Sequence, residues 1–537
     1  MHVAQINLIK LHHVHKTPTE FTAITYYSAL METWLLLAFA GIVSLAFLLK
    51  LSTHKRLKLN HPPGPKPWPI IGNLNLLGSI PHQSLHLLSQ KYGAIMQLKF
   101  GSSPVVVASS PEMAKEFLQT HDVNFASRPA TAAGKYTSYN CSDMTWAPYG
   151  PFWRQARKLY LTQIFNPKRL DFFESIRIEE RRAFISRLYA LSGKPVVMRD
   201  HLMRLTLSSA CQMVLSNKYF AQSEGEGSIV TFEEFQEMID TWFWLGGVFN
   251  IGDWIPWLDR FDLQGYIKQM KELYKKFDRF HNHVLDDHQA RRKTEKDFIP
   301  KDMVDILLQY AEDPDLQVKL TRDQIKGLIQ DLLAGGTDTS ATTVEWAMNE
   351  LLKHPRLIRK AAEELDRVIG KDKWVEEADF SKLPFLEAII KETLRLHPLA
   401  TLLAPRYAIE DCTVAGYHIA KGTTVFINTW SIGRNSKYWD SPEEFIPERF
   451  LEKDIDMKGQ NFALLPFGSG RRRCPGYNLG IKLVRSTLAN LLHGFNWKLP
   501  HGMKPEEICM EELYGLTTHP RISLAMIPEP RLPVNLY

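Results

Sequence analysis

The stretch Leu465-Pro466-Phe467-Gly468-Ser469-Gly470-Arg471-Arg472-Arg473-Cys474-Pro475-Gly476 places one cysteine after two glycines and three arginines. An apolar periodicity typical of a helix begins just beyond it, near Tyr477. A helix N-terminus and neighbouring cations both favour an ionised sulfur. Gly470 and Gly476 permit turns and let the backbone approach a flat partner closely. The loop therefore predicts that Cys474 is a thiolate ligand, although a lone cysteine is more often an inert small hydrophobe.

The bulk composition limits the classes of protein to which the chain can belong. With 537 residues, 45% of them hydrophobic, it can bury a large core. Its five cysteines form no CxxC pair, which argues against a disulfide framework or a zinc site and for a reducing compartment. The net charge of +6 includes no basic tract of the nucleic-acid-binding type, so we expect no nucleic acid partner. A membrane surface or an acidic protein partner remains compatible with this charge.

The N-terminal region predicts a membrane anchor. Residues 33–49 carry no charge, and their length is at the lower limit of about 17–25 residues for a membrane-spanning helix. No small-residue cleavage site follows, which disfavours a signal peptide. The Lys and Arg residues after the apolar run place the following chain in the cytosol. We therefore expect a possible upstream extension at residues 1–30, since Met31 directly precedes the apolar run, and a transmembrane anchor at residues 31–52.

The next segment, residues 53–75, is a basic and proline-rich hinge that includes Pro62-Pro63-Gly64-Pro65-Lys66-Pro67-Trp68-Pro69. Proline fixes φ and removes a hydrogen-bond donor, so we expect a stiff spacer here. Beyond it, residues 95–100 and 105–108 predict a β-hairpin. Most of the remaining chain has helical periodicity without internal repeats, so residues 76–537 are expected to form one domain.

The longest predicted helix runs from Thr321 to His354. Thr321 and Gln324 have the spacing of a capping box, and Pro355 ends the pattern. Such a helix is roughly 50 Å long and crosses a whole domain. Its interior holds Ala334-Gly335-Gly336-Thr337-Asp338-Thr339-Ser340, in which each glycine costs about 1 kcal/mol. Either the glycines allow a kink or tight packing, or the helix opens locally beside a bound group and presents a carboxylic acid next to a hydroxyl.

A second pattern, Glu392-Thr393-Leu394-Arg395, puts a carboxylate and a guanidinium on one helix face. Alone, such a pair is most often a surface contact of little energetic weight. The later sequence Pro447-Glu448-Arg449-Phe450 offers a second arginine. Arg449 can complete a buried, fork-like network around the carboxylate.

Taken in order, these patterns resemble the cytochrome P-450 family, the haem-thiolate monooxygenases, from Pro62 onward. The shared patterns include the proline hinge, the stretch Trp153-Arg154-Gln155-Ala156-Arg157 and the helix that carries the adjacent acid and hydroxyl of Asp338 and Thr339. They also include the Glu392-x-x-Arg395 pair, the stretch Pro447-Glu448-Arg449-Phe450 and a cysteine loop that matches F-G-x-G-x-R-x-C-x-G. The hinge and loop variants are similar to those of the plant microsomal, A-type group. The resemblance implies a mainly α fold with a small β region, preceded by an N-terminal membrane-anchor helix.

The resemblance also implies roles for individual residues. Cys474 would be the axial ligand of the iron of haem b. Asp338 and Thr339 would be catalytic, relaying protons during oxygen activation, and Glu392, Arg395 and Arg449 would form a structural lock. The other cofactor-binding positions would be Trp153, Arg157, Arg406, Phe467, Gly468, Arg472 and Gly476.

Substrate contacts fall in segments that vary within the family. The expected contacts are Leu332, Gly335, Gly336, Leu402, Leu403, Leu516 and Thr517, with the aromatic segment 242–244 and Phe249 nearby. Most are apolar, which favours a hydrophobic or phenolic small molecule. We expect Trp254 and Trp257 to be ordinary core residues.

The expected activity is insertion of one atom of O2 into an aromatic, flavonoid-like substrate, in a single-pass protein of the endoplasmic reticulum membrane. No dinucleotide fingerprint is present, so electrons would come from NADPH through a separate membrane-bound reductase. A basic patch would dock this reductase, formed by Arg471, Arg473, Lys482 and Arg485, with Arg154 and Lys158. The alternatives are oxidation of a terpenoid or steroid, a reductase-independent haem-thiolate isomerase or dehydratase, and a non-catalytic haem-binding protein.

Overall fold

The computed structural model describes residues 33–34, 37–41, 44, 59–216, 219–221, 229–295, 298–453 and 455–537. The chain divides into two units, Met1–Asn60 and His61–Tyr537. The predicted extension at 1–30 lies outside the described residues, as does most of the predicted anchor at 31–52, whose described residues are helical. Among the described residues, no helix has both the length and the apolar character needed to cross a membrane.

The unit His61–Tyr537 is mainly helical with small sheets, which confirms the predicted mainly α fold with a small β region. Its helices are α2 (Pro81–Tyr92), α3 (Pro111–Lys115), α4 (Ala132–Thr137), α5 (Pro151–Leu159), α6 (Pro167–Phe172), α7 (Glu174–Ala190), α8 (Met198–Leu215), α9 (Phe232–Gly247), α10 (Ile251–Trp254), α11 (Tyr266–Thr294), α12 (Met303–Ala311), α13 (Arg322–Lys353), α14 (Pro355–Val368), α15 (Pro384–Leu396), α16 (Thr429–Gly433), α17 (Arg449–Glu452) and α18 (Tyr477–Gly494). Its strands are β1 (Ile95–Phe100), β2 (Ser103–Ala108), β3 (Val196–Val197), β4 (Phe220–Ala221), β5 (Val230–Thr231), β6 (Arg406–Tyr407), β7 (Cys412–Val414), β8 (Tyr417–Ile419), β9 (Thr424–Ile427), β10 (Phe495–Lys498), β11 (Glu512–Leu513), β12 (His519–Pro520) and β13 (Ala525–Pro530).

The largest sheet has the strand order β1-β2-β9-β6. The predicted hairpin is confirmed as the antiparallel pair β1 and β2, although the second strand begins two residues earlier than expected, at Ser103. Strand β9 joins β2 in parallel, and β6 joins β9 in antiparallel orientation. The valines of β2 are fully buried, as expected for a strand paired on both sides and covered by apolar side chains.

The proline-rich segment packs against this sheet. The N–H of Gln97 donates to the carbonyl of Pro63 at 2.8 Å, and Gly72 forms an antiparallel bridge with Phe100. A Cβ at Gly64 would lie 1.8 Å from the carbonyl oxygen of Gln97. This part of the predicted hinge therefore belongs to the folded unit instead of standing free as a spacer.

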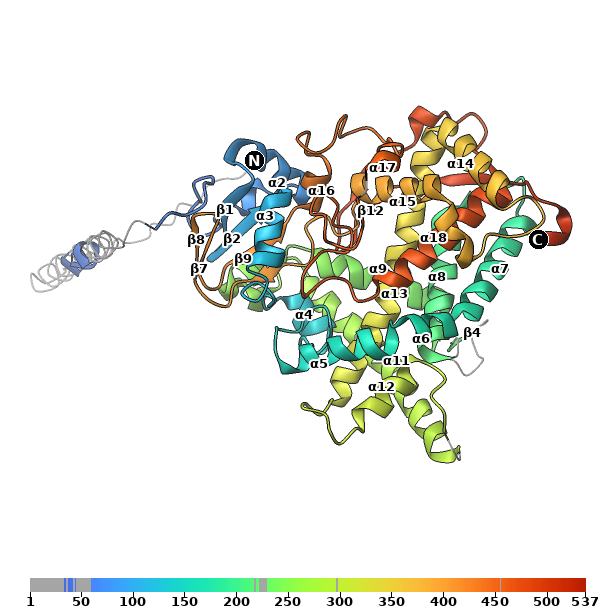
Figure 1. Cartoon of the computed structure of the whole chain (residues 1–537). Coiled ribbons are helices and arrows are strands. Elements are labelled where there is room, and N and C mark those ends of the chain that lie inside the picture. Colours follow the sequence, from blue (N-terminus) through green and yellow to red (C-terminus); the bar gives the residue numbers. More distant parts are fainter. Residues whose placement is uncertain are drawn as a thin grey trace, which may run out of the picture. The chain divides into compact units, whose positions relative to one another are not determined.

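Helix α13 confirms the longest predicted helix. Its N-cap, Thr321, and Gln324 form the complete capping box, and α14 begins at Pro355. The helix packs against α8, α15 and α18 and lies within the helical part of the unit in Figure 1. It continues without a break through Gly335 and Gly336, so the predicted local opening is wrong. The hydroxyl of Thr339, which donates to the Gly335 carbonyl at 2.9 Å, stays within the helix.

Two apolar clusters meet along α13. Apolar residues between 325 and 334 of the helix belong to one cluster, and apolar residues between 341 and 352 belong to the other. Helix α18 is divided in the same way, since Leu479 and Leu483 lie in the first cluster and Ile481 and Leu488 in the second. The stretch between the clusters, with its two glycines, is therefore where a bound group can lie between α13 and α18.

Candidate haem and substrate site

The cysteine loop is held by backbone geometry that requires glycine at two positions. Gly468 and Gly470 have φ values of 65° and 70°. A Cβ at Gly470 would also lie 2.0 Å from the carbonyl of Leu118. Gly476, in contrast, has a φ of −83° as the N-cap of α18, so the predicted turn requirement at this residue is wrong. The N–H of Cys474 donates to the carbonyl of Phe467 at 3.0 Å, which closes the loop.

The surroundings of Cys474 act on its thiol in opposite directions. Burial raises the pKa of the Cys474 thiol, whereas the N–H groups of Gly476 and Tyr477 and the cations Arg157 and Arg473 lower it. The pKa of the Cys474 thiol is raised overall, so the neighbouring N–H groups and cations do not by themselves stabilise the thiolate that the sequence predicts. A metal ion bound to the sulfur would displace its proton and supply the remaining stabilisation.

Cys474 lines two adjoining cavities of about 200 and 290 Å³. The smaller one, here the apolar lobe, includes Trp242, Leu332 and Leu516. The larger one, here the arginine lobe, is lined by Arg128, Arg157, Arg406 and Arg472 among others. The residues common to both are Met144, Thr145, Gly335, Thr339, Phe467, Cys474, Pro475 and Gly480. The two lobes are therefore parts of one site between α13 and the cysteine loop.

The arginine lobe holds more buried positive charge than its carboxylates neutralise. Burial lowers the pKa of Arg406 to about 10, of Arg157 to about 10 and of Arg472 to about 9. The Nη1 atom of Arg406 is buried without a hydrogen-bond partner among the described residues, and it lies 3.9 Å from Oδ1 of Asp122. Buried cations in this state favour an anionic ligand. The two propionates of a haem have the required charge.

Trp153 and Arg472 are placed together at the edge of the arginine lobe. The guanidinium of Arg472 lies over the Trp153 ring at 4.3 Å. The indole N–H of Trp153 donates to the Met144 carbonyl at 3.1 Å. The sequence reasoning missed Arg128, which donates to the carbonyls of Ala404 and Pro405 at 2.7 and 2.8 Å. These two carbonyls lie far from Arg128 in the sequence, so no local sequence pattern indicates that Arg128 belongs to the site.

Helix α13 lines the same cavity as Cys474, and its Gly335 brings no side chain to it. A Cβ at Gly335 would meet no atom of the described chain within 4 Å, so packing between helices does not explain this glycine. Gly335 and Thr339 border both lobes. A thiol on one side, a glycine surface on the other and cations at the edge fit a flat, anionic haem, and Gly468 and Phe467 line the same cavity.

Asp338 points away from this cavity, contrary to the predicted pairing of acid and hydroxyl beside the bound group. Consecutive residues of an unbroken helix are about 100° apart, so only Thr339 faces the lobes. The Asp338 carboxylate is fully buried and lies 3.0 Å from Arg199, 2.6 Å from Oγ1 of Thr517 and 3.0 Å from Nε2 of His519. Burial opposes ionisation, but His519 and Arg199 hold the pKa of Asp338 well below its usual range.

The predicted lock residues form one buried network. The guanidinium of Arg395 binds both carboxylate oxygens of Glu392, at 2.7 and 2.8 Å, and Nε of Arg449 binds the same carboxylate at 3.1 Å. Arg395 also donates to the carbonyls of Pro442 and Glu444, at 2.7 and 2.9 Å. These bonds fix the segment that leads from α16 towards the cysteine loop.

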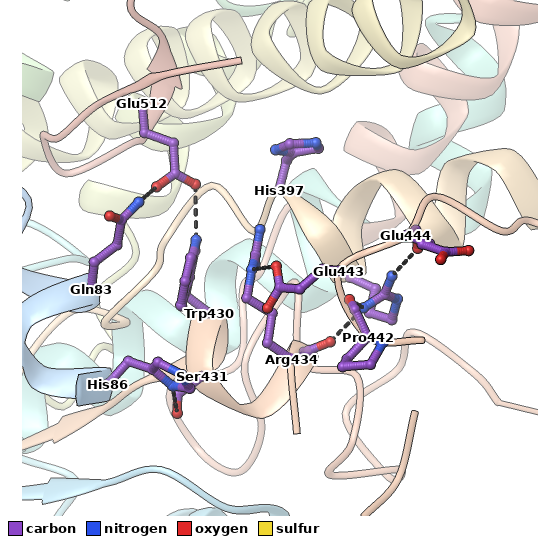
Figure 2. A network of polar contacts seen from close by, with 12 residues as sticks. Gln83, His86, His397, Trp430, Ser431, Arg434, Pro442, Glu443, Glu444 and Glu512 are labelled. Carbon is purple, nitrogen blue, oxygen red and sulfur yellow. Dashed lines mark hydrogen bonds and ion pairs between the residues drawn. The ribbon is translucent and has the colours of Figure 1, made fainter. Parts of the chain in front are cut away.

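The chain around α16 carries further polar contacts, drawn in Figure 2. The indole of Trp430 donates to Glu512 at 2.9 Å, and Gln83 donates to the same carboxylate at 2.8 Å. Arg434 binds Glu443 at 3.1 Å near the surface. Helix α2, helix α16 and strand β11 are joined in this way.

The predicted substrate residues divide among three cavities. Leu332, Gly335, Gly336 and Leu516 line the apolar lobe, and Leu403 and Thr517 line the arginine lobe. Leu402 instead lines a neighbouring cavity with Phe249 and Trp254. Sequence reasoning missed other residues of the apolar lobe, namely Phe165, Met213, Val214, Leu479 and Leu483.

The two tryptophans expected in the core have different surroundings. Trp254 is 8% exposed, so it is a core residue as predicted. Trp257 is 59% exposed, and its assignment to the core is wrong. It lies in a short 3-10 turn, Pro256–Phe261, that contributes no buried residue.

The proposed reductase-docking patch is partly neutralised. Lys482 binds Glu377, and Arg485 binds both oxygens of Glu387 at 2.8 and 2.7 Å. Arg471 lies 3.4 Å from Asp122. These carboxylates lie far from the cations in sequence, so the charge pattern alone overstates the positive potential of this surface.

Comparisons with known proteins agree with this site. The chain is 43% identical to trimethyltridecatetraene synthase of Zea mays, over 89% of this chain and 90% of the relative. It is 42% identical to flavonoid 3'-monooxygenase of Petunia hybrida, over 94% of this chain and 100% of the relative. A solved structure of a zebra fish cytochrome P-450 with abiraterone matches with a TM-score of 0.71 and 25% identity, over 84% of this chain and 100% of that chain. The family model for cytochrome P-450 matches residues 62–525, and the chain belongs to the cytochrome P-450 family.

Proposed function

We propose that the protein is a haem-thiolate monooxygenase that hydroxylates a flavonoid on an aromatic ring. Similarity to flavonoid 3'-monooxygenases of Petunia hybrida and Arabidopsis thaliana, at 42% and 40% identity, supports the substrate class. The apolar lobe supports it as well, since Phe165, Trp242 and Phe243 line it and none of its described lining residues is cationic. Such walls suit a flat, uncharged aromatic molecule.

One observation favours a substrate that carries oxygen atoms. The indole Nε1–H of Trp242 is buried and has no hydrogen-bond partner among the described residues. Trp242 lines the apolar lobe, so a small rotation of its side chain would bring the indole N–H to a ligand there. A buried donor without a partner costs about 1–3 kcal/mol, so a ligand that supplies an acceptor is preferred over one that does not. The carbonyl and hydroxyl oxygens of a flavonoid are such acceptors.

The chain's own residues prepare the site for the reaction. Cys474 would ligate haem b, which binds O2 and supplies the oxidising chemistry. Arg157, Arg406 and Arg472 would hold the propionates and fix the orientation of the ring. Thr339 lines both lobes, and while its hydroxyl donates to the Gly335 carbonyl its oxygen can accept a hydrogen bond from a water there. The apolar lobe excludes bulk water and positions the aromatic C–H.

A terpenoid is the second candidate substrate. The relative at 43% identity is named for an acyclic, methyl-branched polyene, and dimethylnonatriene synthase of Zea mays is equally similar. The apolar walls of the lobe accept such a chain. A hydrocarbon leaves the Trp242 N–H without a partner, which is why we rank a flavonoid first.

A substrate panel with the matched variant Trp242→Phe separates the two candidates. We expect a flavanone with one B-ring hydroxyl to be hydroxylated in reductase-supplemented microsomes, and Trp242→Phe to raise its KM about 10-fold, because about 1.5 kcal/mol of hydrogen bonding is lost. Product is quantified by mass spectrometry. Turnover of acyclic terpenoids alone, or an unchanged flavanone KM in the variant, contradicts the assignment.

We also propose that residues 31–52 anchor the enzyme to the endoplasmic reticulum membrane and that a separate NADPH-dependent reductase supplies its electrons. The uncharged run at 33–49 and the following cations support the anchor. We expect that deletion of residues 1–52 moves the protein from the microsomal pellet to the supernatant and leaves the haem spectrum unchanged. Retention of the truncated protein in a carbonate-washed pellet argues against the anchor.

A further inference from the structure

Thr517 connects the interior cavity with a pocket at the surface. It lies between strands β11 and β12 and lines the arginine lobe. It also lines a more polar pocket with Arg199, Asp240 and His519. Of the described residues, Thr517 alone lines both. The His519 side chain is 15% exposed and that of Asp240 39%, so this pocket is open to water.

The hydrogen bonds of Thr517 form a directed chain. Its hydroxyl donates to Oδ2 of Asp338 at 2.6 Å, and its Oγ1 lies 2.8 Å from Nε2 of His519. Because a hydroxyl has one proton, His519 is the donor to Thr517 when Thr517 donates to Asp338. Nδ1 of His519 forms no hydrogen bond within the described chain. In this arrangement the donors run from His519 through Thr517 to Asp338, and Nε2 of His519 also lies 3.0 Å from the same carboxylate oxygen.

The buried acid is poorly suited to supply protons by itself. Asp338 is shielded from solvent, and the guanidinium of Arg199 lies 3.0 Å away. Arg199 also lies 3.2 Å from Asp240 of α9 and 3.2 Å from Glu345 of α13, so it joins three carboxylates. A carboxylate kept ionised by such a partner holds no proton to give. It can instead accept from the hydroxyl of Thr517 and from Nε2 of His519, and so orient both groups.

We propose that His519 and Thr517 form the route by which protons enter the reaction cavity, with Asp338 and Arg199 as positioning residues. This role rests on the proposed monooxygenase function, which consumes protons as it reduces one oxygen atom to water. The Thr517 hydroxyl turns from Asp338 towards the arginine lobe and releases its proton to an acceptor there, while its Oγ1 takes the Nε2 proton of His519. Water in the surface pocket then restores the proton of His519, and no electrons move in these steps.

The test compares Thr517→Val, Thr517→Ser and His519→Gln with the wild-type holoenzyme, supplied with reductase, NADPH and the flavanone. We expect Thr517→Val to lower both NADPH oxidation and product formation about 10- to 100-fold, since a positioned proton donor contributes about 10²–10⁴-fold. His519→Gln lowers both rates less, because its amide still donates a hydrogen bond but does not ionise. Thr517→Ser keeps the hydroxyl and stays within about 3-fold of wild type.

Two further measurements separate proton transfer from a structural role. Turnover driven by hydrogen peroxide remains near wild type in Thr517→Val, because peroxide brings oxygen already reduced and protonated. The solvent deuterium isotope effect on NADPH-driven turnover rises, because proton delivery becomes limiting. Arg521→Gln is the control, since Arg521 borders the same surface pocket but pairs with Glu511 at 2.8 Å. It is expected to leave all of these rates unchanged.

Several results overturn the route. The route is wrong if Thr517→Val turns over at the wild-type rate with NADPH. It is also wrong if the variant loses peroxide-driven and NADPH-driven turnover equally, because that result indicates a structural role. If wild-type enzyme forms no product from the flavanone, the proposed substrate is wrong. The route is then judged from NADPH oxidation and its isotope effect alone, and unchanged values in Thr517→Val overturn it.

Discussion

Replacing Cys474 with serine is expected to abolish both turnover and the red-shifted carbon monoxide band of reduced, thiolate-ligated haem. The serine hydroxyl is close in size to the thiol, and the loop is closed by the N–H of Cys474 and the carbonyl of Phe467, which the substitution retains. The loop glycines and the bond from Ser469 to Gly459 at 2.6 Å also remain. The variant should therefore fold, while the electron-rich sulfur that defines this class of haem site is lost.

The carbon monoxide difference spectrum of the purified variant measures this effect. The matched control is Cys509→Ser, which removes a half-buried thiol outside both lobes and should leave the band intact. Haem content and circular dichroism show whether the Cys474 variant is folded. A thiolate-type band in Cys474→Ser would refute the ligand assignment.

Replacing Glu392 with glutamine is expected to have the largest effect on stability. The substitution keeps the volume of the side chain but removes the charge that two buried guanidinium groups share, at 2.7 Å from Arg395 and 3.1 Å from Arg449. Breaking a buried ion pair from one side costs about 3–5 kcal/mol, because the remaining charges stay buried. A loss of this size removes a large part of a typical folding free energy of about 5–15 kcal/mol.

Denaturant unfolding and the yield of haem-loaded protein measure the loss. Glu443→Gln is the matched control, because Glu443 accepts from Arg434 at 3.1 Å in the same region (Figure 2) but its side chain is 69% exposed. Solvent screens the charge of Glu443, so its replacement should cost less than that of Glu392, although Arg434 itself is buried. Equal stability of the two variants would show that the Glu392 network does not hold the fold.

The features that the sequence predicts correctly are those encoded by neighbouring residues. The capping box of Thr321 with Gln324, the stop at Pro355 and the hairpin of β1 and β2 all depend on contacts within a few residues. The family could be recognised for a related reason, since each short motif keeps its own local spacing. The need for glycine at position 470 could also be predicted, because residue 470 has a positive φ, a conformation that residues with side chains disfavour.

The features that could not be predicted depend on partners far along the chain. Asp338 lies on the side of α13 that faces Arg199, Thr517 and His519, which belong to α8 and to the segment around β12. Lys482 and Arg485 similarly meet Glu377 and Glu387, so their charge is less available than the basic pattern indicates. The sequence shows which residues are charged or polar, but the tertiary fold decides which residues they pair with.

The central claim is that this chain inserts one atom of O2 into a flavonoid with electrons from a reductase. The most direct measurement incubates the wild-type enzyme, reductase, NADPH and a flavanone with one B-ring hydroxyl under isotopically labelled oxygen gas. Our account predicts a hydroxylated product that carries one labelled oxygen atom and does not form without reductase. A product that forms without reductase, or whose new oxygen comes from water, would contradict it.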